Sequence, residues 1–150
     1  MREELAQFQQ HTTDFLDALA LIPDRKRNEA PEGEWSAAFI VHHTADVEVH
    51  FSARYLLTLG ADNPPLIFFD EDQYPDRLKY AQRSLNKSLA AIVGIRAMIG
   101  ETLELLDEAE WDRTMTHGEG KSATLARLVA KADGHIVSHT EQLRSLAATL

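Results

Sequence analysis

Two histidines, His135 and His139, stand four residues apart in a segment with helical periodicity. On an α-helix this spacing places both imidazole rings on one face, one turn apart. Both lie on the same stripe as apolar residues that recur every three or four positions, namely Leu125, Leu128, Val129, Ala132, Ile136, Leu143, Leu146 and Ala147. We therefore expect both rings to face the interior. Because buried ring nitrogens need partners, metal coordination is the leading interpretation and a structural pair is the alternative.

A third histidine of this kind, His43, lies in the helix expected from Ser36 to Leu59. Ser36 is a natural N-cap for this helix, and Gly60 is a natural stop. His43 falls on the apolar stripe, so it is expected to face inward as well. Three protein ligands that leave a coordination position open are typical of a catalytic rather than a structural zinc site.

Other polar residues compete for a place in this site. His50 is the rival candidate on the same helix, but it lies about 10 Å along the axis from His43, too far to share an ion. His42 should point about 100° away from His43 and be exposed or at a helix contact. Asp46, three residues after His43, is within reach of a hydrogen bond to its ring. We interpret Asp46 as an orienting group, with a catalytic base as the alternative. His11 has no partner at one-turn spacing and is not expected to be a ligand.

Composition restricts the class of protein. The chain has 150 residues, which suits a single domain over residues 1–150, and it has no cysteine, so disulfides and thiolate ligands are excluded. The formal net charge of -9 argues against nucleic-acid binding. No secretory signal and no apolar run of roughly 20 residues is visible, so a membrane location is not expected. The absence of cysteine fits a reducing cytoplasm, where we expect the protein to be located.

Four amphipathic segments predict an all-α fold. They run from Glu3 to Leu21, from Ser36 to Leu59, from Asp76 to Asp107, and from a cap at Ser122 or Thr124 almost to Leu150. One apolar stripe on each helix favours a four-helix bundle, with long connections between the second and third helices and between the third and fourth.

Arg96 and the two long connections are considered separately from the three histidines. Arg96 interrupts an apolar run, and we expect it to reach a carboxylate or solvent, with a substrate contact as the alternative. The connection after Gly60 carries aromatic residues expected to cover one end of the core. Its Asp70 and Asp72 are expected to form a solvated turn, with a site for a hard cation as the alternative. The connection from Glu108 to Ser122 is expected to be ordered, with a short extended pair.

The chain resembles the DinB-like (DinB/YfiT) metal-binding four-helix-bundle family. The resemblance rests on Trp35-Ser36 before the second helix, followed by His43, Asp46 and Glu48. It also rests on residues in the later part of the chain that follow the family's order: Tyr80, Arg96, Trp111, the HGEG turn at 117–120, Thr124-Leu125, and His135-x-x-x-His139-x-x-Gln142. One departure is Ile136, where many relatives have aspartate. Without it, Asp46, Glu141 or backbone carbonyls would orient the imidazoles.

The resemblance implies that His43, His135 and His139 bind one divalent metal ion, with zinc or nickel the most typical. It further implies a metal-dependent enzyme that activates a low-molecular-weight thiol for transfer to an electrophilic small molecule. A metal-dependent hydrolase and a non-catalytic metal-binding module of the stress response are the alternatives. Relatives often form homodimers, although no apolar surface stripe in this sequence indicates one.

Overall fold

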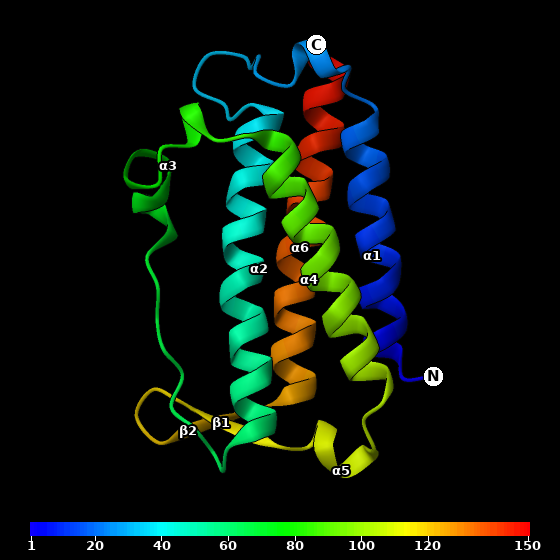
Figure 1. Ribbon diagram of the computed structural model, residues 1–150, viewed down its shortest axis with the longest axis vertical. Helices are drawn as coiled ribbons and strands as arrows, with labels where there is room; N and C mark the ends of the chain where they lie inside the picture. Colours follow the sequence, from blue (N-terminus) through cyan, green and yellow to red (C-terminus); the bar gives the residue numbers. More distant parts are fainter.

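Four long helices lie side by side in the computed structural model, which describes residues 1–150 (Figure 1). They are α1 (Glu3–Ala20), α2 (Ala37–Gly60), α4 (Leu85–Glu104) and α6 (Leu125–Thr149). Helix α6 packs against α1 and α2, and α2 also packs against α4. The expected all-α four-helix bundle is therefore confirmed. No helix combines the length and the apolar character needed to cross a membrane.

Short elements occupy the connections. After the 3₁₀ turn η1 (Asp24–Lys26), the link between α2 and α4 contains η2 (Glu71–Gln73), α3 (Tyr74–Arg77) and η3 (Tyr80–Gln82). The link between α4 and α6 contains α5 (Glu108–Trp111) and the antiparallel strands β1 (Thr114–His117) and β2 (Lys121–Thr124), in which Thr114 pairs with Thr124. The ordered connection with a short extended pair is thus confirmed.

Hydroxyl side chains mark where three of the long helices begin. Ser36, Ser84 and Thr124 each accept a hydrogen bond from the backbone N–H three residues further on, which satisfies a donor left free at the helix start. The prediction that the third helix begins near Asp76 is wrong, because α4 begins at Leu85. Lys79 adopts a left-handed backbone conformation with φ of 58°, which interrupts the helical path before Ser84 caps the true start.

The apolar core has two parts with a buried polar layer between them. One part includes Phe8, Tyr55 and Ile99, and the other includes Phe15 and Ile92. Arg96 of α4 lies between the two parts, at the same height in the bundle as the buried Glu48 of α2. The polar layer therefore crosses the bundle near its middle.

Arg96 is the centre of this layer. Its guanidinium donates hydrogen bonds to Glu48 Oε1 at 2.8 Å, to Asp133 Oδ1 at 3.0 Å, to Thr12 Oγ1 at 2.6 Å and to the Phe8 carbonyl at 2.8 Å. These partners come from α1, α2 and α6, so one side chain of α4 joins all four long helices. The expectation that Arg96 reaches a carboxylate is confirmed.

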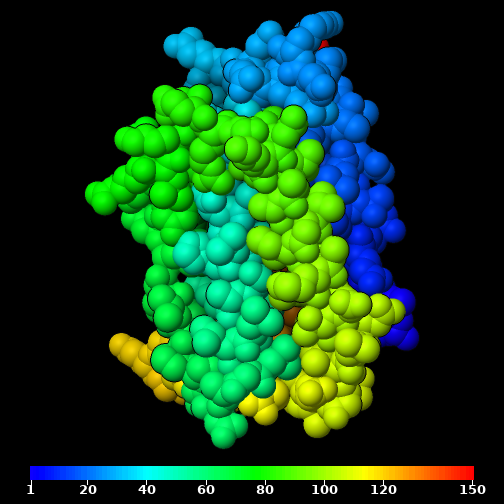
Figure 2. All heavy atoms as spheres, in the orientation of Figure 1, coloured from blue at the N-terminus to red at the C-terminus, as the bar shows by residue number.

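The segment 61–73 runs beside α2 and is held at both ends (Figures 1 and 2). The Leu66 N–H donates to the Thr116 carbonyl at 2.8 Å, and the Thr116 N–H donates to the Pro64 carbonyl at 2.9 Å, so the segment pairs with β1. Further along, Phe69 stacks on the His50 ring with a centroid distance of 3.9 Å. Leu66 and Phe69 pack against the core, as expected for this connection, whereas Phe68 is 70% exposed.

Candidate metal centre

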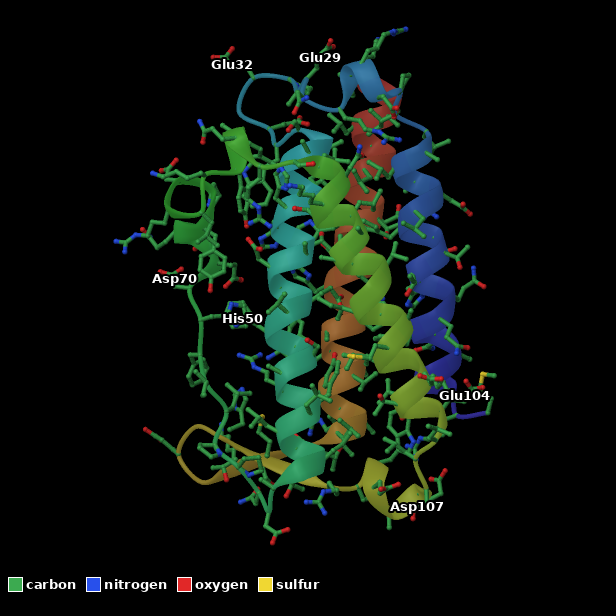
Figure 3. The ribbon with its side chains drawn as sticks, viewed as in Figure 1. Glu29, Glu32, His50, Asp70, Glu104 and Asp107 are labelled. Atoms are coloured by element: carbon green, nitrogen blue, oxygen red, sulfur yellow. The ribbon has the colours of Figure 1, made fainter.

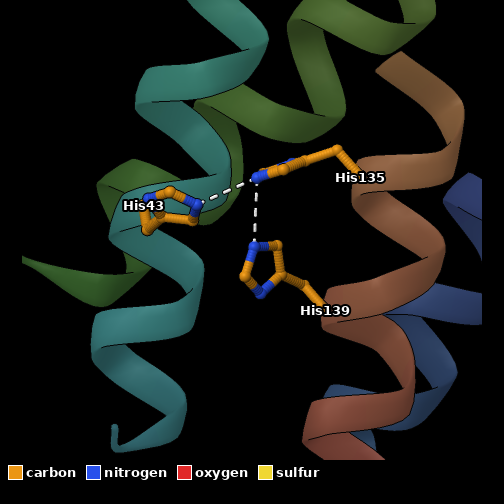
Figure 4. Close-up of side chains that lie close together, drawn as sticks. All are labelled: His43, His135 and His139. Carbon is orange, nitrogen blue, oxygen red and sulfur yellow. Dashed lines mark hydrogen bonds between the residues drawn. The ribbon is translucent and has the colours of Figure 1, made fainter. Parts of the chain in front are cut away.

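Three imidazoles converge between α2 and α6 (Figure 4). His43 extends from α2, and His135 and His139 extend from successive turns of α6. The Nε2 atom of His135 lies 2.9 Å from Nε2 of His43 and 3.1 Å from Nε2 of His139. One ligand atom from each of the three residues lies within 4.8 Å of the others. Residues 92 positions apart in the sequence are thus brought to a single point.

The donor set fits a divalent transition metal. A neutral imidazole nitrogen carries either one proton or one lone pair, so Nε2 of His135 cannot make two good hydrogen bonds to its two neighbours. The Nδ1 atoms of His43 and His135 are buried and have no hydrogen-bond partner. Three lone pairs directed at one point satisfy a cation better than they satisfy one another, and imidazole suits zinc, copper, iron and nickel.

Gln142 determines which ring nitrogen of His139 carries the lone pair and which carries the proton. The Nδ1–H of His139 donates to Gln142 Oε1 over 2.8 Å. With the proton on Nδ1, the lone pair lies on Nε2, which is the atom that faces the other two rings. A glutamine three residues after a histidine lies on the same side of a helix, so this spacing is the signal by which the sequence could reveal the pair.

Burial keeps the three rings neutral. It lowers the pKa of His43 to about 4 and that of His135 to about 3, and repulsion from the neighbouring imidazole of His139 adds to both shifts. The pKa of His139 is also lowered by burial, against the hydrogen bond to Gln142. Near pH 7 all three residues are therefore in the unprotonated form that binds a metal ion.

Aromatic rings surround the imidazoles. The Trp35 ring meets the His43 ring edge-on at a centroid distance of 5.1 Å, and the Phe51 ring lies 6.4 Å from that of His135. His43 is 5% exposed, whereas His135 and His139 are half-buried. The site is therefore closed on the α2 side and more open along α6.

Asp46 does not form a hydrogen bond with any of the three imidazoles. Its carboxylate accepts hydrogen bonds from Arg83 Nη1 at 2.8 and 2.9 Å and from the Tyr80 hydroxyl at 2.8 Å. Its charge opposes the fall in the pKa of His43, but less strongly than burial and the His139 ring promote it. Asp46 instead joins α2 to the turn that precedes α4. Arg83 had no recognisable signal in the sequence, because it lies in a turn far from α2 along the chain.

The remaining histidines lie outside the cluster. His50 accepts or donates a hydrogen bond at 2.7 Å with the Tyr74 hydroxyl and faces the 61–73 segment that carries Asp70 (Figure 3). His42 is buried and bonds Ser88 of α4 at 2.8 Å, which confirms the helix contact and excludes the exposed position. His11 forms a hydrogen bond through Nδ1 with the Asp133 carboxylate. The Asp70 carboxylate caps the backbone N–H of Asp72 within an exposed turn.

The sequence matches the DinB superfamily over residues 7–143, and the chain belongs to this family. Among its curated relatives, a protein of Geobacillus kaustophilus named "Putative metal-dependent hydrolase" is 27% identical over 148 residues, covering 97% of this chain and 83% of the relative. A protein of Oceanobacillus iheyensis with the same description is 24% identical and covers 96% of this chain and 83% of the relative.

Two solved structures share the fold. YfiT of Bacillus subtilis, described as a four-helix bundle of unusual topology, superposes with a TM-score of 0.76 at 19% identity, over 95% of this chain and 85% of that one. A mycothiol-dependent maleylpyruvate isomerase superposes with a TM-score of 0.75 at 13% identity. The match covers 94% of this chain and 59% of the isomerase. At these identities the likeness establishes the fold alone.

Proposed function

We propose that the protein is a divalent-metal-dependent enzyme whose metal ligands are His43, His135 and His139. The observation that carries the proposal is the convergence of three neutral imidazole nitrogens within 4.8 Å of one another. The relatives named metal-dependent hydrolases support metal dependence. A divalent ion held by three protein ligands keeps open positions, where it lowers the pKa of a bound thiol or water.

The preferred substrate pair is a low-molecular-weight thiol and an electrophilic small molecule. A mycothiol-dependent isomerase shares this fold, which supports thiol chemistry in a bundle of this kind. Thiolate sulfur is a soft ligand that zinc and nickel accept readily. None of the three imidazoles has a carboxylate hydrogen-bonded to it, and the nearby Asp46 carboxylate is held by Arg83 and Tyr80.

The residues of the chain prepare the site in three ways. Gln142 holds His139 in the tautomer with Nε2 free, and burial keeps His43 and His135 unprotonated. Trp35 limits solvent access from the α2 side. The fixed positions on two packed helices mean that little rearrangement is needed when the ion binds.

A metal-dependent hydrolase is the second candidate. The names of the curated relatives favour it. It would use water in place of the thiol at the same three-histidine centre. The two candidates therefore differ in nucleophile and share the same ligands.

The first experiment is metal analysis of untagged protein. We expect about one zinc or nickel ion per chain, lost in His43→Ala, His135→Ala and His139→Ala. His50→Ala is the matched control, because His50 lies on α2 but bonds Tyr74 outside the cluster. Full occupancy in all three variants would contradict the proposed ligands.

The second experiment separates the two reactions. Metal-loaded protein is given a panel of electrophiles with low-molecular-weight thiols, and thiol consumption is followed; a panel of carboxylic esters without thiol is followed in parallel. Metal-dependent thiol consumption supports transfer, and metal-dependent ester cleavage supports hydrolysis. A protein that binds metal but turns over neither panel would favour a non-catalytic metal-binding module.

A further inference from the structure

A cavity of about 620 Å³ lies on the side of the bundle where Phe51 separates it from His135. Its walls come from the lower half of α2, the 61–73 segment, the β1–β2 hairpin and the first turns of α6. Figure 2 shows this segment beside α2 and the hairpin projecting near its lower end. The volume lies within the usual range of small-molecule sites, roughly 300–1,000 Å³.

Positive charge is concentrated around this cavity. Arg54, Lys121, Arg127 and Lys131 line it, and Glu71 is the only acidic residue among the lining side chains. The chain as a whole has 15 Lys and Arg against 24 Asp and Glu, so the local balance is the reverse of the global one. A concave surface lined by charges of one sign raises the local concentration of ligands with the opposite charge.

None of these four cations forms an ion pair within the protein. Arg2, Arg27, Arg83, Arg96, Arg113 and Arg144 all have carboxylate partners. By contrast, no carboxylate oxygen lies within the 4.0 Å ion-pair distance of Arg54, Lys121, Arg127 or Lys131. Their charges are therefore available to a ligand.

Arg54 is the best positioned of the four. Its Nη2 donates to the Ile67 carbonyl at 2.8 Å, and its guanidinium lies over the rings of Phe51 and Phe69 at 5.3 and 4.9 Å. Its Nε is buried without a hydrogen-bond partner. Burial lowers the pKa of Arg54, which reflects a guanidinium that has lost water without gaining a carboxylate in contact. A planar guanidinium fixed in this way suits a carboxylate ligand.

The cavity also has apolar walls, and one of its wall residues, Phe51, lies beside the candidate metal centre. Phe51, Leu66, Phe69 and Leu128 line it. The Phe51 ring lies 6.4 Å from the His135 ring. Lys131 precedes His135 by one helical turn, about 6 Å along the axis. The three histidines do not line the cavity themselves, so the Phe51 ring is the wall that a bound ligand would share with the metal centre.

We propose that this cavity binds an amphipathic organic anion, an apolar body bearing a carboxylate, as the substrate of the three-histidine centre. The anion meets Arg54, Arg127 and Lys131, and its body packs on Phe51 and Phe69. As a substrate assignment this rests on the proposed function, but binding of the anion to the cavity does not require the metal.

Calorimetry with a matched pair of probes tests the proposal. The probes are 2-naphthoate and 2-naphthamide, which have nearly the same shape and differ in charge. We expect naphthoate to bind at least roughly tenfold more tightly than the amide and to lose affinity as salt is raised. Equal affinity for the two probes would overturn the proposal.

Variants of exposed cations locate the binding site. We expect Arg127→Gln and Lys131→Gln each to weaken naphthoate binding roughly threefold, and the double variant roughly tenfold. Lys87→Gln, an exposed lysine in the first turn of α4, is the control and should change nothing. Naphthoate affinity unchanged in the double variant would contradict the assignment.

Repeating the titration in His43→Ala separates this proposal from the proposed function. A preference for naphthoate that persists without metal supports anion binding in the cavity. This holds even if the three histidines prove not to be the metal ligands. If the preference for naphthoate is lost when the metal is lost, the carboxylate binds the ion. This result would overturn the cavity proposal. Metal bound by the native protein without any preference for naphthoate leaves the metal centre intact and excludes the anion site.

Discussion

His139 and Gln142 form a hydrogen bond of 2.8 Å between Nδ1 and Oε1 on the face of α6 that carries the candidate metal ligands. The bond places the lone pair of His139 on Nε2. Partners of this kind typically contribute tenfold to a hundredfold to metal affinity. If His139 is a ligand as proposed, the pair fixes its tautomer before the ion binds.

Replacing Gln142 by leucine should therefore weaken zinc binding by roughly tenfold, because the His139 ring loses the acceptor that fixes its tautomer. Chelator competition measures the change. Gln142→Glu keeps an acceptor oxygen at the same reach and should retain the affinity. Equal losses in both variants would mean that an acceptor oxygen at position 142 does not fix the tautomer of His139.

Metal-free protein should lose stability as the pH falls. The pKa of His43 is about 4 in the folded chain, below its ordinary value of 6.5. Between these values the unfolded chain binds the proton and the folded chain does not, so falling pH favours unfolding. The free energy of unfolding should drop by about 1–2 kcal/mol for His43 alone between pH 6.5 and pH 5.

Urea unfolding of chelator-treated protein at the two pH values measures this drop. His43→Asn removes the titrating ring and should make the pH dependence shallower. A slope that is the same in the variant and in the native chain would show that other groups cause it.

Removing the guanidinium of Arg96 should be strongly destabilising. Arg96→Met leaves Glu48 and Asp133 buried without their shared partner, which typically costs about 3–5 kcal/mol. The midpoint of urea unfolding should fall accordingly. Arg25→Met, at an exposed arginine with no ion pair, serves as the control. A loss below about 1 kcal/mol would mean that the carboxylates find water or take up protons at little cost.

Asp46→Asn distinguishes an effect on the metal site from an effect on the α2–α4 junction. Because both carboxylate oxygens are occupied by Arg83 and Tyr80, we expect a loss of stability of about 1–2 kcal/mol with metal affinity changed by less than roughly threefold. Unfolding and chelator competition on the same preparation measure both quantities. A large loss of affinity with unchanged stability would instead support an orienting role toward His43.

The sequence predicted the features that depend on short spacings. His135 and His139 lie one turn apart wherever a helix forms, and the apolar stripes directed His43 inward. Ser36 and Thr124 act as caps because a hydroxyl at that position satisfies a nearby backbone N–H. The start of the third helix was mispredicted, because the apolar pattern continues through the turn in which Lys79 is left-handed.

By itself, then, the sequence determined the four-helix bundle and the placement of the three histidines on the apolar faces of their helices. Helical periodicity and capping act over a few residues, so a single sequence is enough to reveal them. Only the tertiary structure decided that Asp46 pairs with Arg83 and not with a histidine, and that Arg54 and Lys131 face one cavity. Those relationships depend on how helices, hairpin and the 61–73 segment pack. Such contacts join residues from different elements, and no spacing along the chain encodes the distance between them.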